Sequence, residues 1–383
     1  MAWLDRRLLT AVAVALAVAT AAGIVLLWPT GVIPHLSSAP AASHAAHVIA
    51  VRNGRCEGPA GGRCVWATVS VAHRHANVDL GPAATAPKLS VGEAIRVRHE
   101  PVPRGAADGG TTAWQFVDVD RHGPLLWLAG IAVLLSVLVL RWRGLLAALG
   151  VVISLWLVVS FLIPALLAGK PALPVALVTS LAVMFVTLVL TSGLGPQTLA
   201  AALGIGSTLL LTALVALLAS AAAHLNGRTD DLSSYLSTVG SGISLSGIVL
   251  ASMVIGALGV LADTAVTQAS AVISLRHADP ALGPRALYKA SLRIGRDHLS
   301  ATIHTLVLAY VGAALPLLLI TRYSGVGLMD AVDTQDVAEP IVAALVGCLG
   351  LICAVPLTSG LAAVLVARVQ PDELGDAHAH PHH

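Results

Sequence analysis

The chain contains seven long apolar stretches without a charged side chain. A hydrocarbon core about 30 Å thick is crossed by roughly 17–25 residues of helix, because lipid offers no partner to exposed backbone groups. Only 11% of the 383 residues are charged, whereas soluble domains carry about 25%. The sequence therefore predicts a mainly α, polytopic transmembrane helix bundle, with spans at Pro124–Leu140, Leu145–Ala168, Leu173–Leu190, Thr198–Ala223, Ile243–Leu261, Ala301–Ile320 and Ile341–Ala367.

An eighth apolar stretch, Leu8–Leu27, follows two arginines near the N-terminus. A secretory signal peptide also begins with positive charge before an apolar core, but it ends at small residues of the Ala-x-Ala type. This stretch ends instead in Leu-Trp-Pro, at residues 27–29. We therefore interpret residues 1–29 as an uncleaved first helix, with a signal peptide as the alternative, and we expect about eight spans.

Positive charges in the short loops predict the orientation, because cytoplasmic loops are enriched in Lys and Arg. With the N-terminus inside, the loop that carries four carboxylates, Thr321–Glu339, lies outside. Lys170 is the single exception. Both termini are then expected in the cytoplasm, on the same side as the basic groups Arg6/Arg7, Arg141/Arg143, Arg276–Arg296 and Arg368.

Residues 30–122 differ in composition from the rest and predict one small extracytoplasmic domain. Apolar and polar residues alternate from Val65 to Val71, which is the period of a half-buried strand. Gly92 suits a tight turn. We expect a β-rich OB-like or SH3-like barrel after an Ala/Ser/Pro-rich linker, with strands at His47–Val51, Cys64–Ala72, Lys88–Val97 and Ala113–Asp120.

The cysteines predict one disulfide and no metal site. Cys56 and Cys64 flank a Gly-rich loop on the expected oxidising side, so a disulfide is the first interpretation. A metal or redox pair with His73 or His75 is the alternative, although no Cys-x-x-Cys spacing supports it. The His-rich tail, residues 369–383, is interpreted as a disordered end, with metal binding as its alternative. We expect no cofactor.

Asp263 is the main candidate for a functional group near a span. Placing an ionisable side chain in lipid costs about 3 kcal/mol or more in free energy, so such residues usually serve a function. It follows the sixth span, and we expect it near the cytoplasmic end of that helix. Proton or cation binding and a structural ion pair are both open. Polar residues continue on or beside its face at helical spacing, namely Thr264, Thr267, Gln268, Ser270 and Ser274.

A basic segment follows. Arg285, Lys289, Arg293 and Arg296 recur at steps of four, four and three, which places them on one face of an amphipathic helix, residues 283–298, at the cytoplasmic surface. Anionic lipid headgroups are the expected partner. Asp263 and Arg296 lie at the expected ends of successive spans and are predicted to pair. Asp297 lies four residues after Arg293, so a local ion pair is its simplest interpretation.

Two further ionisable groups lie close to the last spans. His304 lies within the seventh span, where it is a candidate for titration near neutral pH, although a hydrogen-bonded buried histidine is commoner. Glu339 precedes the last span.

Three segments resemble the YibE/F-like multitransmembrane protein family. They are Ile255–Ala265; Ile294–Asp297 with Thr305–Gly312 and Leu315–Leu318; and Glu339 with Leu345–Gly347 and Gly350–Thr358. The resemblance implies a bacterial inner-membrane protein with seven or eight spans and an N-terminal extracytoplasmic region, but it implies no particular chemistry. His304 and Ala301 stand where the family pattern has Asn and Thr, so a polar cluster there is expected to differ.

The leading functional hypothesis is a secondary transporter or permease for an unknown small solute or ion, with a site drawn from Asp263, Arg296, Asp297, His304 and Glu339. The alternative is a non-transporting envelope assembly or sensing component that acts through a partner protein or a homo-oligomer. The net charge of +2, without a continuous basic patch, excludes nucleic acid. The chain lacks a phosphate-binding loop and a His-Glu-x-x-His motif, so we expect no enzyme.

Overall fold

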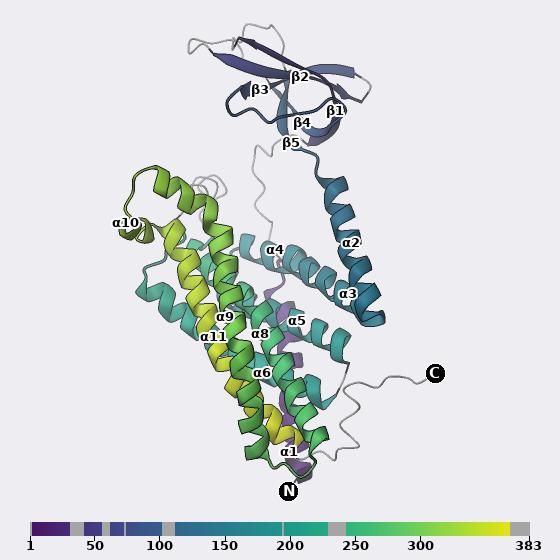
Figure 1. Cartoon of the computed structure of the whole chain (residues 1–383), viewed down its shortest axis with the longest axis vertical. Coiled ribbons are helices and arrows are strands. Elements are labelled where there is room, and N and C mark those ends of the chain that lie inside the picture. The colour runs from purple at the N-terminus through teal and green to yellow at the C-terminus, as the bar shows by residue number, and fades with distance from the viewer. Residues whose placement is uncertain are drawn as a thin grey trace. The chain divides into compact units, whose positions relative to one another are not determined.

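The computed structural model describes residues 2–30, 42–55, 62–72, 74–101, 112–193, 195–228 and 243–367. The chain divides into two compact units. One unit covers His35–Leu138 and contains the strands and most of helix α2 (His122–Leu140). The other combines Met1–Pro34 with Val139–His383 and contains the remaining helices (Figure 1).

The strands of the first unit close into a barrel in the order β1-β2-β3-β5-β4 (Figure 1). Neighbouring strands are antiparallel except for β3 and β5, which pair in parallel. This order is that of an OB-like barrel, whereas an SH3-like barrel is a meander. The strands are β1 (Ser43–Arg55), β2 (Arg63–Val71), β3 (Arg74–Pro82), β4 (Ala94–Pro101) and β5 (Thr112–Val119).

The apolar side chains of alternating positions fill the barrel, including Val69, Val78, Ile95 and Val97. Strand β4 begins later than predicted, at Ala94, because the preceding residues form a turn. Gly92 adopts a φ of 90° there, a conformation that glycine tolerates best. The sequence analysis missed β3, and it misplaced the start of β4.

The barrel continues into α2 through a short polar junction. The backbone N–H of His122, the first residue of α2, donates to Asp120 at 3.0 Å. Arg121 pairs with Asp118 at 2.7 Å. The hydrogen bonds from Arg121 and from the backbone of Val119 lower the pKa of Asp118. The hydrogen bond from the backbone of His122 lowers the pKa of Asp120 as well, so both carboxylates stay ionised at neutral pH, and Asp120 holds the start of the helix.

The helices of the second unit include the predicted spans. Seven of the described helices are long and apolar enough to cross a membrane, counting α2, and their positions confirm the seven charge-free stretches. Helix α1 contains a shorter apolar part, Ala11–Leu27, so its role as an eighth span stays a prediction. The helices are α1 (Ala2–Leu27), α3 (Trp142–Leu157), the π-turn η1 (Val158–Leu162), α4 (Ile163–Leu167), α5 (Ala172–Ser192), α6 (Pro196–Ala222), α8 (Leu245–Ala278), α9 (Pro284–Tyr323), α10 (Leu328–Val332) and α11 (Gln335–Val366).

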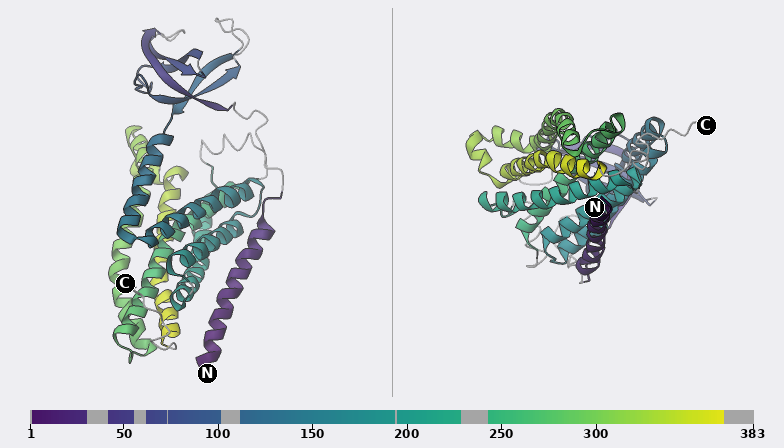
Figure 2. Two further views of the ribbon diagram at one scale, coloured as in Figure 1. Left: turned by 90° about the vertical axis from the view of Figure 1, so that its right-hand side faces the viewer. Right: turned by 90° about the horizontal axis from the view of Figure 1, so that it is seen from below.

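Helices α6, α8 and α11 form the centre of this unit, and α9 packs against α8 and α11 (Figure 2). Lipid provides no hydrophobic drive for helices to associate, so small residues that allow close backbone approach matter most. Gly204 of α6 faces Thr358 of α11: a Cβ at Gly204 would lie 2.8 Å from Cγ2 and 2.9 Å from Cβ of Thr358. The contact leaves no room for even one methyl group.

Helix α9 is a single helix of 40 residues. At 1.5 Å per residue it is roughly 60 Å long, about twice the hydrocarbon thickness. The basic segment, residues 283–298, was expected to form an amphipathic helix at the membrane surface. It is instead continuous with the span: no proline lies between Pro284 and the apolar part, and the helix continues through Gly295, which packs against Gln268.

Replacing Gly204 with Ala should lower the thermal stability of the detergent-solubilised protein, because the new methyl group would separate α6 from α11. Overpacking of this kind costs about 1–3 kcal/mol. Gly259 of α8 is the matched control, since a Cβ there would meet nothing within 4 Å. Gly259→Ala should leave the melting temperature unchanged or raise it, because Ala favours helix. Equal effects of the two substitutions would contradict the contact.

Candidate functional site

Asp263 lies well inside α8 and not near its end. The helix continues for fifteen residues beyond Asp263, to Ala278. The charge-free stretch ends at Ala262 but the helix does not, so the expected position of Asp263 near the cytoplasmic end of the span stays a prediction. Arg276 bonds the carbonyl of Leu282 at 2.8 Å and so holds the turn that follows α8.

Contacts between helices fix the height of Asp263 in the bundle. Gly204 of α6 faces Thr358 of α11. Ser359, which follows Thr358 in α11, donates a hydrogen bond to Gln268 of α8. Gln268 is therefore level with a point eight residues into α6, roughly 12 Å from the start of that helix. Asp263 lies five residues earlier on α8, about 7.5 Å farther in. His298 of α9, whose ring lies 3.6 Å from Asp263, precedes the charge-free stretch Ala301–Ile320 by three residues, so Asp263 is level with the start of that stretch.

The partner of Asp263 is His298 of α9 and not Arg296. His298 Nε2 and Asp263 Oδ2 are 3.6 Å apart, and their side chains are 33% and 65% exposed. Two residues correspond to about 200° around a helix, so Arg296 points away from α8 when His298 faces it. The predicted pair of Asp263 and Arg296 is therefore absent within one chain.

A set of buried hydroxyl and amide groups lies next to this pair, and we call it the inner polar cluster. Its members are fully buried: Thr264, Gln268, Thr358 and Ser359. Ser359 Oγ donates to Gln268 Oε1 at 3.0 Å. A Cβ at Gly295 of α9 would lie 2.7 Å from the same oxygen, so α9 closes the cluster on one side.

Three polar atoms of the inner polar cluster have no hydrogen-bond partner among the described residues: Thr264 Oγ1, Gln268 Nε2 and Thr358 Oγ1. A buried polar group without a partner costs about 1–3 kcal/mol, so such groups are rare. Pro356 of α11 adds to the local polarity, because it cannot donate to the carbonyl of Ile352. Three unsatisfied polar atoms thus belong to this cluster, while Ser180 Oγ of α5 and Arg276 Nε of α8 are unsatisfied outside it.

Glu339 lies in a second polar region, which we call the outer pocket. This cavity of about 350 Å³ is formed by α8, α9 and α11, and its polar lining residues are Ser252, Tyr310, Asp336 and Glu339. Asp336 and Glu339 come from the first turns of α11. Ser252 and Tyr310 come from α8 and α9, the helices that also bear Asp263 and His298. Both polar regions therefore involve the same three helices.

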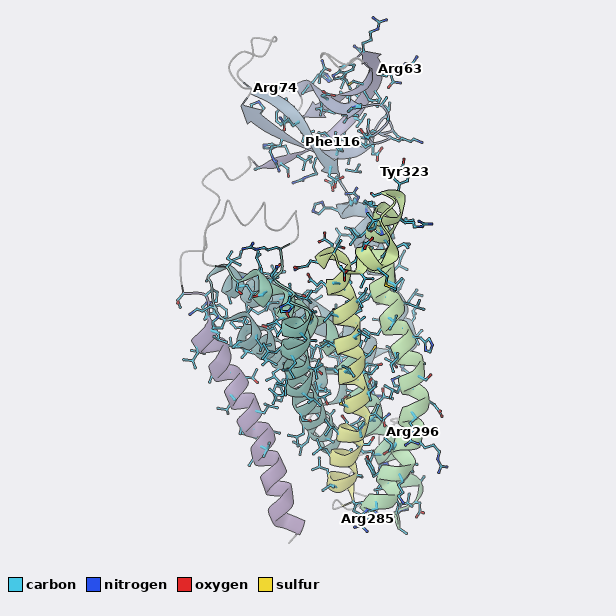
Figure 3. All side chains as sticks on the ribbon, turned by 90° about the vertical axis from the view of Figure 1, so that its left-hand side faces the viewer. Arg63, Arg74, Phe116, Arg285, Arg296 and Tyr323 are labelled. Atoms are coloured by element: carbon cyan, nitrogen blue, oxygen red, sulfur yellow. The ribbon has the colours of Figure 1, made fainter. Side chains whose placement is uncertain are left out.

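The other predicted site residues lie on the exposed side of α9. Arg285 and Arg296 lie on the lower half of α9 and Tyr323 at its opposite end (Figure 3). Lys289, Arg293, Asp297 and His304 are exposed as well. Arg293 and Asp297 form no ion pair in the described structure, and His304 Nδ1 bonds the carbonyl of Ser300, 2.7 Å away on the same helix.

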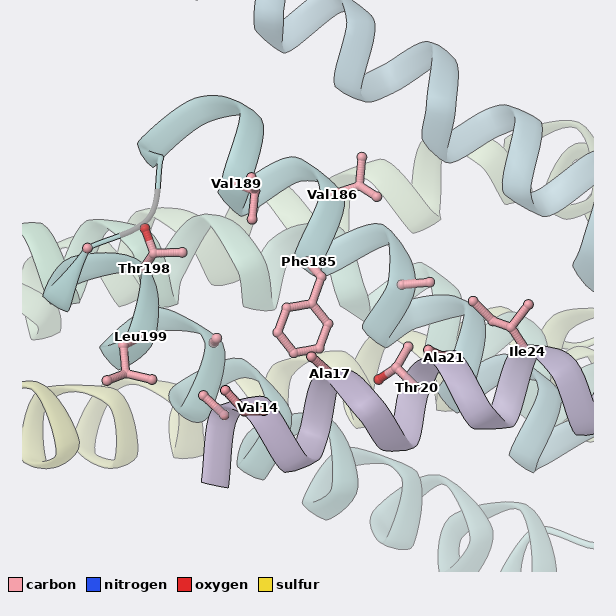
Figure 4. A pocket seen from close by; sticks show the side chains of 14 residues that line it. Val14, Ala17, Thr20, Ala21, Ile24, Phe185, Val186, Val189, Thr198 and Leu199 are labelled. Atoms are coloured by element: carbon pink, nitrogen blue, oxygen red, sulfur yellow. The ribbon is translucent and has the colours of Figure 1, made fainter. Parts of the chain in front are cut away.

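An apolar groove of about 540 Å³ lies between α1, α5 and α6, with Phe185 in its middle (Figure 4). Two hydroxyl groups line it, but both bond to backbone carbonyls of nearby residues: Thr20 to Leu16 at 2.7 Å, and Thr198 to Gly193 at 2.6 Å. The groove therefore offers no free polar side chain, and its chemistry suits hydrocarbon.

The predicted disulfide involves a residue outside the described part of the chain. Cys64 is buried at the start of β2, and Cys56 lies outside the described residues, as do His73 and residues 369–383. Within the described ranges, no group of three or more His, Cys, Asp or Glu could hold a metal ion. The disulfide stays a prediction.

The sequence analysis did not select His298, Thr358, Ser359 or Gln268 as site residues. Gln268 offers a usable signal, since it is the one amide within a long apolar helix, between Asp263 and Arg276. Ser359 offers none by itself, because hydroxyl residues are common in membrane helices.

Ser359→Ala should lower the free energy of unfolding by about 1–3 kcal/mol, because it leaves the buried Gln268 oxygen without its donor. In the double variant with Gln268→Met, the loss should be smaller than the sum of the two single losses, since residues in one hydrogen bond are coupled. Thermal unfolding in detergent measures both values. Additive losses would show that the hydrogen bond contributes nothing.

Comparison with known proteins agrees with this architecture. The family model described as YibE/F-like protein matches residues 128–368. The match covers every described helix from α3 to α11 and excludes the barrel. No curated protein and no solved structure matches the chain. Because the matched range is more than half of the chain and coincides with its apolar helices, this multi-pass membrane protein belongs to the YibE/F-like family.

Proposed function

We propose that the protein is a secondary transporter or permease of the bacterial plasma membrane, and that the inner polar cluster forms part of its route. The observation that carries the proposal is the set of three buried, unpartnered polar atoms on Thr264, Gln268 and Thr358. Evolution tolerates such groups in a membrane core where they serve a substrate or ion. The cargo is a small solute or ion that hydrogen bonds to amide and hydroxyl groups.

Asp263 and His298 give this route an ionisable element. A carboxylate within a candidate span either carries a proton, binds a cation or faces a neutralising partner. His298 is the nearest ionisable partner, with its Nε2 atom 3.6 Å from Asp263 Oδ2. In this proposal Asp263 exchanges a proton or cation, while Thr264, the next residue, and Gln268, five residues farther along the same helix, orient the cargo.

The outer pocket provides a candidate entrance. Its carboxylates, Asp336 and Glu339, lie at the start of α11, and the inner polar cluster lies near the other end of the same helix. We place the outer pocket on the extracytoplasmic side, together with the barrel, because basic loops favour the cytoplasm. Arg285, Lys289 and Arg293 then meet anionic headgroups at the cytoplasmic surface.

The alternative is a non-transporting assembly or sensing component that binds a partner through the barrel or through α9. The exposed charged residues of α9 favour this alternative, because they could bind a partner protein. A flux measurement separates the two functions, because only a transporter moves ions across a sealed bilayer.

Purified protein in liposomes should dissipate an imposed gradient of protons or of sodium, potassium, magnesium or chloride ions, followed with ion-sensitive dyes. Asp263→Asn and Gln268→Met should each reduce the rate at least about tenfold, a loss of roughly 1.4 kcal/mol in transition-state stabilisation. Asp279→Asn, in the exposed turn after α8, is the control and should retain the wild-type rate. Flux no faster than in empty liposomes for every ion would favour the non-transporting component.

Orientation is tested separately. A reporter that is active only in the cytoplasm should work when inserted in the turn at residues 279–283 and should be silent at Thr85, in a loop of the barrel. Positive charges segregate to the first site and not to the second. An active reporter at Thr85 would reverse the proposed topology without affecting the flux result.

A further inference from the structure

The two threonines of the inner polar cluster differ from the other buried threonines of the described chain. The others each donate their hydroxyl hydrogen to a backbone carbonyl nearby in the sequence: Thr20, Thr179, Thr198, Thr208 and Thr212. This is the usual bond of a hydroxyl group within a helix. Thr264 and Thr358 form no such bond with any described residue. Their hydroxyl groups are therefore available to donate to a ligand.

The side-chain amide of Gln268 presents donors and no free oxygen. Ser359 Oγ donates to Gln268 Oε1 at 3.0 Å, so the amide oxygen already has a partner. The Nε2 atom carries two N–H donors and accepts no hydrogen bond. It has no partner among the described residues, although Gln268 is fully buried. A buried donor of this kind is satisfied only by an acceptor, so the free side of Gln268 selects a ligand that is rich in lone pairs.

The three unpartnered groups come from neighbouring positions on two packed helices. Thr264 precedes Gln268 by four residues, so both side chains lie on one side of α8. Thr358 directly precedes Ser359, which contacts Gln268. Helix α9 leaves little room beside them, because a Cβ at Gly295 would lie 2.7 Å from Gln268 Oε1. A ligand that reaches these donors must therefore be small.

The charges around the inner polar cluster favour an anion over a cation. The buried polar side chains of the described residues are all neutral, so no buried carboxylate is present there to hold a cation. Asp263 is adjacent to Thr264 in sequence, but its side chain is 65% exposed whereas Thr264 is fully buried. The two side chains thus point to different sides of α8. Hard cations bind through oxygen acceptors, whereas anions bind through N–H and O–H donors.

We propose that the inner polar cluster binds a small monovalent anion of the size of chloride, held by the N–H groups of Gln268 and the hydroxyl groups of Thr264 and Thr358. All three side chains donate to the ion. Ser359 orients the Gln268 amide by occupying its oxygen, and so turns the N–H groups away from itself. Binding does not require transport, whereas the role of the anion as cargo rests on the function proposed above.

Equilibrium binding of radioactive chloride to the purified protein, in detergent and sodium gluconate buffer, tests the site. The wild-type protein should bind chloride saturably. Gln268→Glu keeps an oxygen for Ser359 but replaces the N–H donors with a second carboxylate oxygen. It should weaken chloride binding at least about tenfold, because hydrogen bonds to a charged ligand are the strong ones. Unchanged chloride affinity in this variant, or saturable binding of radioactive sodium in place of chloride, would overturn the proposal.

Two further variants test the hydroxyl groups, and they keep the test decisive if Gln268→Glu fails to fold. Thr264→Val and Thr358→Val preserve the shape of the side chain and remove its donor. Each should weaken chloride binding at least about fivefold. Thr179→Val is the matched control, because Thr179 is fully buried but already donates to the carbonyl of Val175 at 2.7 Å. It should bind chloride as the wild type does. Equal affinities in all three variants would contradict the site.

The chloride-binding assay and the liposome assay separate the anion site from the transport function. Chloride binding that is weakened by Gln268→Glu, in a protein that moves no ion across liposomes, would support the site and count against transport. Flux of a cation by a protein that binds no chloride would support a transporter and overturn the anion site. Chloride flux that is lost in Gln268→Glu would support both.

Discussion

The close packing of α6, α8 and α11 is the contact on which the helical unit depends. Lipid gives these helices no hydrophobic reason to associate, so dispersion between closely fitted surfaces and a few hydrogen bonds must hold them together. Gly204 allows α11 to approach α6 until Thr358 touches its backbone, and Gly295 allows α9 to approach Gln268. The polar side chains come together because the backbones can approach so closely.

This packing has a chemical consequence. It buries Thr264, Gln268, Thr358 and Ser359 completely but supplies, among the described residues, one hydrogen bond between helices for them, from Ser359 to Gln268. A structure selected only for stability would replace such groups with apolar ones of similar size. The proposed route therefore lies where the helices pack closely and buried polar atoms lack hydrogen-bond partners.

The sequence predicted those elements whose signal is local. The seven charge-free stretches are helices, and β2 lies where Val65, Ala67, Val69 and Val71 alternate. Strand β3 was missed because only Val78 and Leu80 face the core, among polar neighbours. The end of the charge-free stretch did not mark the end of helix α8, because the helix continues through polar residues that neighbouring helices cover. The end of a helix therefore cannot be read from the position of the first charged residue after an apolar stretch.

The sequence by itself determined the membrane class, the helices and the existence of a small β domain, because length, apolarity and period 2 act within one segment. Only the tertiary structure decided which polar residues meet. Gln268 and Ser359 are 91 residues apart in the chain, and their hydrogen bond depends on the rotation and height of two helices. Helix rotation also explains why Asp263 contacts His298 and not the predicted Arg296. Two residues change the direction of a side chain by more than half a turn, and only packing fixes which side of a helix faces inward.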